Sequence, residues 1–234
     1  MQPRSAFSRL IRERRKFMGV TKTDFVRGLQ CPKMLWLDSH KPAEKLIPAE
    51  VQVRLNKGNE FGDRAMGLFG EYLETTTYRA DGKLDYAAMI EKTSRYLLAG
   101  TPVICEAAFS WYGNYCAADI LRKTEGGYEL YEVKNSEMPR KEFLIDLGFQ
   151  SFLIGKSGVS LAGRFLVLRD KDGGFRIADE TKAAKLYERT AEKKIWELAS
   201  LKKRETPEPR IAVGDQCERP YECWYYGYCH KNCK

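Results

Sequence analysis

The chain has 234 residues and a formal net charge of +8, which is enough sequence for one large domain or for one domain with a small appendage. Hydrophobic residues make up 43% of it, and no apolar run approaches the ~20 residues that a membrane-spanning helix needs. The basic segment 1–17 lacks the apolar stretch of a secretory signal. We therefore expect a cytoplasmic protein with a basic arm over 1–20, an Arg-rich transit peptide being the alternative. The positive charge favours a polyanionic partner.

Helical signals occupy the first hundred residues. The segment 21–28 opens with TKTD, which is typical of a capping box, and predicts a short helix. A second short amphipathic segment covers 31–37. Apolar residues at helical spacing predict a longer helix over 48–72 and another over 83–98.

Strand signals follow in the middle of the chain. Alternating apolar residues bounded by turn residues predict strands over 102–110, 115–122 and 128–134, joined as hairpins. A helix is expected over 141–155 and a further strand over 161–169. The interleaving of helices and strands indicates an α/β protein with a mixed central sheet flanked by helices.

The last part of the chain contains a charged helix over 180–203 and a Pro-punctuated linker, TPEPR, over 206–210. We expect one folded domain over 21–205, with a cysteine-rich tail over 206–234. The basic residues of 182–204 have two interpretations, which are a solvated helix face and a surface that follows phosphates.

Acidic residues end or interrupt the three predicted hairpin strands. Glu132 and Lys134 are two apart, so they point to one face of a strand, and burial of such a pair is costly without a use. If the strands are neighbours, Glu106 and Asp119 converge on them. Carboxylate oxygens, with the carbonyl of Val133 as a further ligand, suit Mg²⁺ or Mn²⁺.

Two interpretations of this group remain open. In the functional one, Lys134 stands beside an attacked phosphate, and orients water or stabilises charge. In the other, Glu132 and Lys134 are a solvated pair on an edge strand. Gln150 belongs to the next predicted helix and interrupts an apolar face, which favours the functional interpretation.

Seven cysteines form the second pattern, four of them in the last eighteen residues. An odd number without a secretion signal argues against a disulfide framework, and clustered thiols indicate metal or cluster ligands. The tail spacing, C-x5-C-x5-C-x3-C, lacks the C-x2-C pairs of zinc sites. Cys105 and Cys116 are expected to be small buried residues on strands.

The residues 104–136, which contain Glu106, Asp119 and the Glu132-Val133-Lys134 run, resemble the second and third motifs of the PD-(D/E)XK nuclease superfamily. FQSFLI, with Gln150, is similar to the motif that follows in its RecB-like branch. The resemblance implies a restriction-endonuclease-like core and a Mg²⁺- or Mn²⁺-dependent DNase. The residues that it implicates in catalysis or metal binding are Glu106, Asp119, Glu132, Val133, Lys134 and Gln150.

The segments LQCPKMLWL and CERPYECWYYGYC resemble the two ends of the iron–sulfur staple in CRISPR-associated exonucleases and in helicase–nucleases. This resemblance implies a [4Fe–4S] cluster that joins the N- and C-terminal segments. Its implied ligands are Cys31, Cys217, Cys223 and Cys229, with Cys233 as a spare or competing thiolate. The tail aromatics either wrap this cluster or stack on DNA bases.

The chain departs from the branch pattern at two positions. Gly62 stands where many RecB-like nucleases carry a metal-binding His, and Ile154 stands where an aromatic residue is usual. Glu60 or Glu106 could supply the missing ligand.

We expect a DNase that acts on single-stranded DNA or on DNA ends, as an exonuclease or end-processing nuclease in DNA repair or CRISPR adaptation. We expect it to bind protein partners in such a complex and not to associate with a membrane. One alternative is a weakly catalytic or non-catalytic DNA-binding component of a larger complex. The other is a zinc-stapled structural protein.

Overall fold

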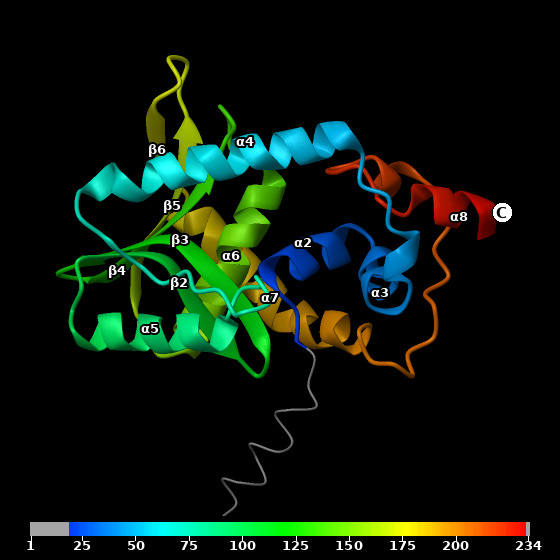
Figure 1. Ribbon diagram of the computed structural model, residues 1–234, viewed down its shortest axis with the longest axis horizontal. Helices are drawn as coiled ribbons and strands as arrows, with labels where there is room; N and C mark the ends of the chain where they lie inside the picture. Colours follow the sequence, from blue (N-terminus) through cyan, green and yellow to red (C-terminus); the bar gives the residue numbers. More distant parts are fainter. Residues whose placement is uncertain (1–18, 233–234) are drawn as a thin grey trace, which may run out of the picture.

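The computed structural model describes residues 19–232, so most of the expected basic arm and Cys233 lie outside the described residues. It is an α/β structure with a six-stranded mixed sheet flanked by helices, as the sequence predicts (Figure 1). The strand order is β1-β2-β3-β4-β5-β6. The strands are β1 (Leu73–Glu74), β2 (Val103–Trp111), β3 (Asn114–Thr124), β4 (Gly127–Lys134), β5 (Leu161–Arg169) and β6 (Phe175–Asp179).

The three central strands form the expected antiparallel hairpins, β2 with β3 and β3 with β4. β4 then pairs in parallel with β5, which requires a crossover connection, and helix α6 (Lys141–Lys156) provides it. The edge strands β1 and β6, which the sequence patterns do not predict, pair with β2 and β5.

Five further helices agree with the predicted segments apart from their ends. They are α2 (Lys22–Gln30), α3 (Pro32–His40), α4 (Ala49–Ala65), α5 (Tyr86–Leu98) and α7 (Thr181–Ser200). The short helix α8 (Tyr226–Asn232) lies in the tail, where the sequence patterns predict none, and 3-10 turns stand at Pro42–Glu44, Met66–Phe69 and Asp215–Cys217. The helix predicted over 48–72 is too long, because the chain tightens into a 3-10 turn after Ala65. Gly70, at φ 90°, then turns it toward β1.

The capping box at the start of α2 is confirmed. The Thr21 hydroxyl accepts a hydrogen bond from the Asp24 N–H at 3.2 Å, and the Asp24 carboxylate accepts one from the Thr21 N–H at 3.0 Å. This pair satisfies two backbone donors that the helix start leaves open. It also makes Lys22 the first residue of α2.

Each face of the sheet carries its own hydrophobic cluster. On one face Leu130 and Leu166 pack with residues of α6 and α7. On the other face Tyr131 and Val167 pack with Phe61 of α4, and α4 lies along this side of the sheet in Figure 1. The alternation of β4 between the two clusters follows from the two-residue repeat of a strand, and it places Glu132 and Lys134 on the α6 face.

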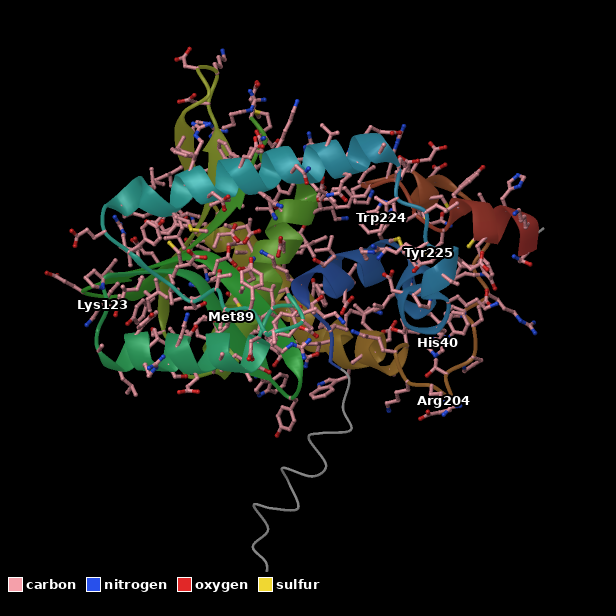
Figure 2. The ribbon with its side chains drawn as sticks, in the orientation of Figure 1. His40, Met89, Lys123, Arg204, Trp224 and Tyr225 are labelled. Carbon is pink, nitrogen blue, oxygen red and sulfur yellow. The ribbon has the colours of Figure 1, made fainter. Side chains whose placement is uncertain are left out.

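A third cluster joins the two ends of the chain. Met34 and Leu37 of α3 pack with Tyr225 and the tail cysteines, and the Tyr225 hydroxyl donates to Asp38 at 2.8 Å. The Gln30 side-chain amide donates to two tail carbonyls, at 2.8 and 2.6 Å. Figure 2 shows Trp224 and Tyr225 beside α2 and α3. Within residues 19–232, no helix is both long and apolar enough to cross a membrane.

Candidate functional site

The end of the β3–β4 pairing creates the site. The last paired residues of this hairpin are Ile120 and Tyr131, so the following stretch of β4 has no neighbour on the β3 side. The Val133 N–H there donates to the Asp119 carboxylate at 2.6 Å. A strand-edge donor is satisfied by a side chain, and this bond holds Asp119 against the Glu132–Lys134 run. The expectation for Val133 concerned its carbonyl; the contact that the structure shows uses its N–H.

In the register of β2 with β3, Cys105 pairs with Ile120 and Ala107 with Ala118, so Glu106 and Asp119 fall between these two pairs. The φ of Glu106 is +55°, a conformation that costs a non-glycine residue roughly 1–3 kcal/mol. Cys105 packs in the α4-side cluster and Ala107 in the α6-side cluster, although residues two apart on a strand normally share a face. The backbone at Glu106 therefore inverts the alternation of β2 beside the carboxylates. Burial, and next the charge of Asp119, raise the pKa of Glu106 to about 8.

Glu132 is the most enclosed carboxylate of the group, with 1% of its side chain exposed. Lys134 donates to one of its oxygens at 2.5 Å, and the Gln150 side-chain amide donates to the other at 2.6 Å. Gln150 is itself fully buried on α6. The structure thus brings Asp119, Glu132, Lys134 and Gln150 together, and a solvated edge pair does not describe them.

Asp146 joins the same network, although the sequence analysis missed it. It accepts hydrogen bonds from Lys134 at 2.7 Å and from Gln150 at 3.0 Å. Burial, and next the nearby Glu132 charge, raise its pKa. The signal for it was its spacing, because a residue four positions before Gln150 lies on the same helix face.

Lys22 was also missed, and it lies at the centre of the site. Its ammonium nitrogen is 3.4 Å from an Asp119 oxygen and 3.2 and 3.3 Å from the two Glu132 oxygens. Burial alone would lower its pKa, but Asp119 and Glu132 together raise it well above the ordinary value. No local pattern points to this residue, since its partners lie 97 and 110 positions away.

The fit of a divalent metal to this site can be tested from the ligands present. Oxygen donors of the right kind converge, since Asp119 and Glu132 face one point. Lys22 fills that point, however, and among residues 19–232 no group of three or more His, Cys, Asp or Glu is arranged to hold a metal ion. In this arrangement the site holds a side-chain cation, and the carboxylates do not fit a metal as they stand.

Two cavities meet at Lys22 and Lys134. One, of about 370 Å³, lies under α4 and reaches Glu106, Asp119 and Glu132. Gly62 lines it, and nothing lies within 4 Å of the place where a side chain at this position would begin. The other cavity, of about 280 Å³, lies between α2, α4 and the tail, and its walls include Tyr221 and Trp224.

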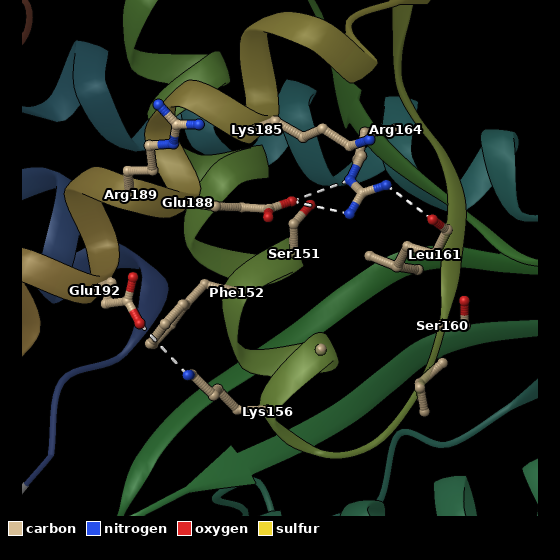
Figure 3. A pocket seen from close by; sticks show the side chains of 12 residues that line it. Ser151, Phe152, Lys156, Ser160, Leu161, Arg164, Lys185, Glu188, Arg189 and Glu192 are labelled. Carbon is tan, nitrogen blue, oxygen red and sulfur yellow. Dashed lines mark hydrogen bonds and ion pairs between the residues drawn. The ribbon is translucent and has the colours of Figure 1, made fainter.

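A larger cavity, of about 610 Å³, lies elsewhere, between α6, β5 and α7 (Figure 3). Arg164 pairs there with Glu188 at 2.9 Å and donates to the Leu161 carbonyl at 2.9 Å. Lys185 and Arg189 of the charged helix also line it. None of the residues that the sequence analysis assigns to catalysis is among its walls.

Four cysteines gather at the junction of the tail with α3, namely Cys31, Cys217, Cys223 and Cys229, all buried in one cluster. Burial, together with the charges of neighbouring cysteines, raises the pKa of the Cys31 and Cys223 thiols. The donors are the soft ones that a cluster or zinc prefers. Their arrangement nevertheless does not meet the geometry of a metal-holding group within residues 19–232. Cys105 and Cys116 are buried on strands, as expected.

The tail aromatics lie in two different surroundings. Tyr225 is fully buried in the cysteine cluster. Trp224 lines the cavity beside Lys134, and the Arg27 guanidinium lies 4.2 Å from its ring centre.

Comparisons with known proteins add little. No family model and no curated protein matches the chain. Among solved structures, the crystal structure of SSO0001 is similar over 88% of this chain and 90% of that one, with 14% sequence identity and a TM-score of 0.40. A similarity of this degree supports no statement about function.

Proposed function

We propose that this protein is a DNase of the PD-(D/E)XK class that hydrolyses phosphodiester bonds and requires Mg²⁺ or Mn²⁺. The observation that carries the proposal is the convergence of Asp119, Glu132 and Lys134, from neighbouring strands, with Gln150 of the crossover helix. Carboxylates and an ammonium line two cavities, a buried amide is bonded to one of the carboxylates, and a purely structural sheet has no need of such a group. The restriction-endonuclease-like core belongs to this proposal.

The protein's own groups have separate roles in it. Lys134 is held by Glu132 and Asp146 at 2.5 and 2.7 Å, and they raise its pKa enough to outweigh burial, so it stays charged. A fixed ammonium beside a phosphate stabilises negative charge in the transition state. Gln150 orients Glu132, and Asp119 is oriented by the Val133 N–H. Since the carboxylates do not fit a metal in this arrangement, we assign no step to the ion.

The substrate class is DNA, as single strands or ends. Two cavities that share Lys22, Arg54, Leu55 and Lys134 offer a basic passage past the carboxylates, and aromatic and apolar walls suit unpaired bases. A net charge of +8 favours the same partner. An exonuclease or end-processing role in repair or CRISPR adaptation, in the cytoplasm and with protein partners, completes the proposal.

The [4Fe–4S] cluster also remains a proposal. Its support is the shared burial of Cys31, Cys217, Cys223 and Cys229 and the softness of thiolate ligands. When bound, the cluster would tie the tail to α3. Anaerobically purified protein that is brown, with iron and sulfide in stoichiometric amounts, would support it, whereas colourless protein with bound zinc would favour a zinc-stapled structural protein.

The test of activity uses anaerobically purified protein and end-labelled single- and double-stranded DNA, with Mn²⁺, with Mg²⁺ or with EDTA. Lys134→Ala and Asp119→Ala should each lower the cleavage rate at least about 100-fold, because removal of a transition-state charge contact costs ~3 kcal/mol or more. Lys57→Ala, on the exposed face of α4, is the charge-matched control and should cleave normally. Unchanged cleavage by the Lys134 variant would sink the assignment.

A non-catalytic DNA-binding component is the second candidate. The position of Lys22 between the carboxylates and the absence of a side chain at Gly62 favour it. DNA binding without cleavage under every metal condition would select this candidate.

A further inference from the structure

The carboxylates of Asp119 and Glu132 already share a cation. The Lys22 ammonium contacts three of their four oxygens, at 3.4, 3.2 and 3.3 Å. The fourth, Asp119 Oδ2, accepts the Val133 N–H. Lys22 therefore occupies the point at which these carboxylates would hold a shared ion.

A cation is needed there for electrostatic reasons. Glu132 is 1% exposed, and a second carboxylate beside a buried one is destabilising unless positive charge compensates. Lys134 cannot serve both carboxylates, because it is bound between Glu132 and Asp146. Lys22 is the ammonium that faces Asp119 and Glu132 together.

Lys22 also has room to leave. Its side chain is 27% exposed, and it is carried by the first residue of α2, on a flexible four-carbon stem. It lines three cavities, of about 280, 490 and 370 Å³. Other rotamers can therefore take the ammonium away from the carboxylates without unfolding the helix.

We propose that Lys22 is a resident cation that competes with divalent metal for Asp119 and Glu132. In the metal-free protein it keeps the two carboxylates together, and a divalent ion enters only when the ammonium moves into a neighbouring cavity. This inference rests on the proposed function, since the ion is the one that DNA hydrolysis is proposed to need. The residue then sets the metal concentration at which the site becomes loaded.

The test measures Mn²⁺ binding to the full chain by isothermal titration calorimetry and by the EPR signal of free Mn²⁺, without DNA. Lys22→Met keeps the length of the side chain and removes its charge. We expect Mn²⁺ to bind this variant at least about tenfold more tightly than the unaltered protein, because the competing ammonium is gone. Lys22→Arg, which keeps the charge, should bind Mn²⁺ as weakly as the unaltered protein.

Three controls make the result specific. Lys57→Met removes the same charge from the exposed face of α4 and should leave Mn²⁺ affinity within about twofold, since solvent screens such a site. Asp119→Asn combined with Lys22→Met should lose the gain. In chelator, Lys22→Met should melt at a lower temperature than the unaltered protein, and Mn²⁺ should restore it. Lys22→Gln replaces Lys22→Met if the latter does not fold.

Equal or weaker Mn²⁺ binding by folded Lys22→Met or Lys22→Gln would overturn the inference, and so would a gain that survives Asp119→Asn. The binding and cleavage results separate the two proposals. If Lys22→Met binds Mn²⁺ more tightly but no variant cleaves DNA, the inference about Lys22 stands and the proposed nuclease activity is rejected. If DNA cleavage depends on metal but Lys22→Met gains no Mn²⁺ affinity, the proposed nuclease activity stands and the inference about Lys22 is rejected.

Discussion

At the scale of single residues, the site contains more carboxyl groups than ammonium groups. Its four carboxyl groups are Glu106, Asp119, Glu132 and Asp146, and its two ammonium groups are Lys22 and Lys134. The sequence pattern found three of the carboxyl groups and Lys134, because they lie on or beside predicted strands. It missed Lys22 and Asp146, since nothing local distinguishes a helix Lys or Asp that points inward from one that points to solvent.

Glu106 gives a pH prediction. Burial, then Asp119, raise its pKa from 4.5 to about 8, so the folded protein holds a proton that the unfolded chain releases near pH 4.5. Its contribution to stability is therefore complete below pH 4.5 and is lost as the pH rises through 8. In chelator, the free energy of unfolding should fall by roughly 2 kcal/mol or more between pH 5 and 9 through this group.

Glu106→Gln should flatten that decline, as followed by urea unfolding at a series of pH values. Glu91→Gln, on the exposed side of α5, should retain it. An identical pH slope in Glu106→Gln and the unaltered protein would show that the carboxyl group titrates normally.

At the scale of elements, local patterns predicted what local forces decide. The central strands and most helices were found, because each carries its own apolar repeat and its own turn residues. β1 has two residues and β6 five, and such edge strands form mainly because a neighbour offers hydrogen bonds. The end of α4 was predicted too late for a similar reason, since the turn toward β1 depends on Gly70.

Helix α4 offers a second prediction, at the position where the resemblance expects a metal-binding His. Gly62 lines the cavity that contains Asp119 and Glu132, and its missing side chain leaves open space. Gly62→His should raise Mn²⁺ affinity, on the order of tenfold, by adding an imidazole ligand. It should also stabilise α4 by roughly a few tenths of a kcal/mol, because Gly is less favourable than His inside a helix.

Calorimetric Mn²⁺ titration and thermal melting measure the two effects separately. Gly155→His, on α6 and also bordering open space, lines a cavity away from the carboxylates and is the matched variant. An equal affinity gain from both positions would argue against a specific metal site at Gly62.

At the scale of the whole molecule, the two ends of the chain meet. The cysteine cluster joins α3 to the tail, and the tail in turn forms a wall of the cavity beside Lys22 and Lys134. Closure of so long a loop adds only slowly to stability with length, so we regard the placement of the tail beside the site as the main consequence.

The corresponding prediction concerns the cysteines. Cys223→Ala in anaerobically purified protein should lower the melting temperature, because a tail anchor is lost, and, on the proposed cluster, should also lower the iron content. Cys116→Ala, a buried strand cysteine outside the junction, should lower the melting temperature modestly and leave the iron content unchanged. Full iron content in Cys223→Ala would remove this residue from the ligand set.

By itself, the sequence determined the α/β class, the hairpins of the sheet and the residues Asp119, Glu132, Lys134 and Gln150 as a candidate group, because strand and helix periodicities are local properties. Only the tertiary structure decided that the β3–β4 pairing stops at the Ile120–Tyr131 pair, that the backbone at Glu106 reverses the face alternation of β2, and that Lys22 enters between the carboxylates. The last of these depends on charges brought together from positions 97 and 110 residues apart. Electrostatic compensation in a buried site acts through space, and sequence order does not record it.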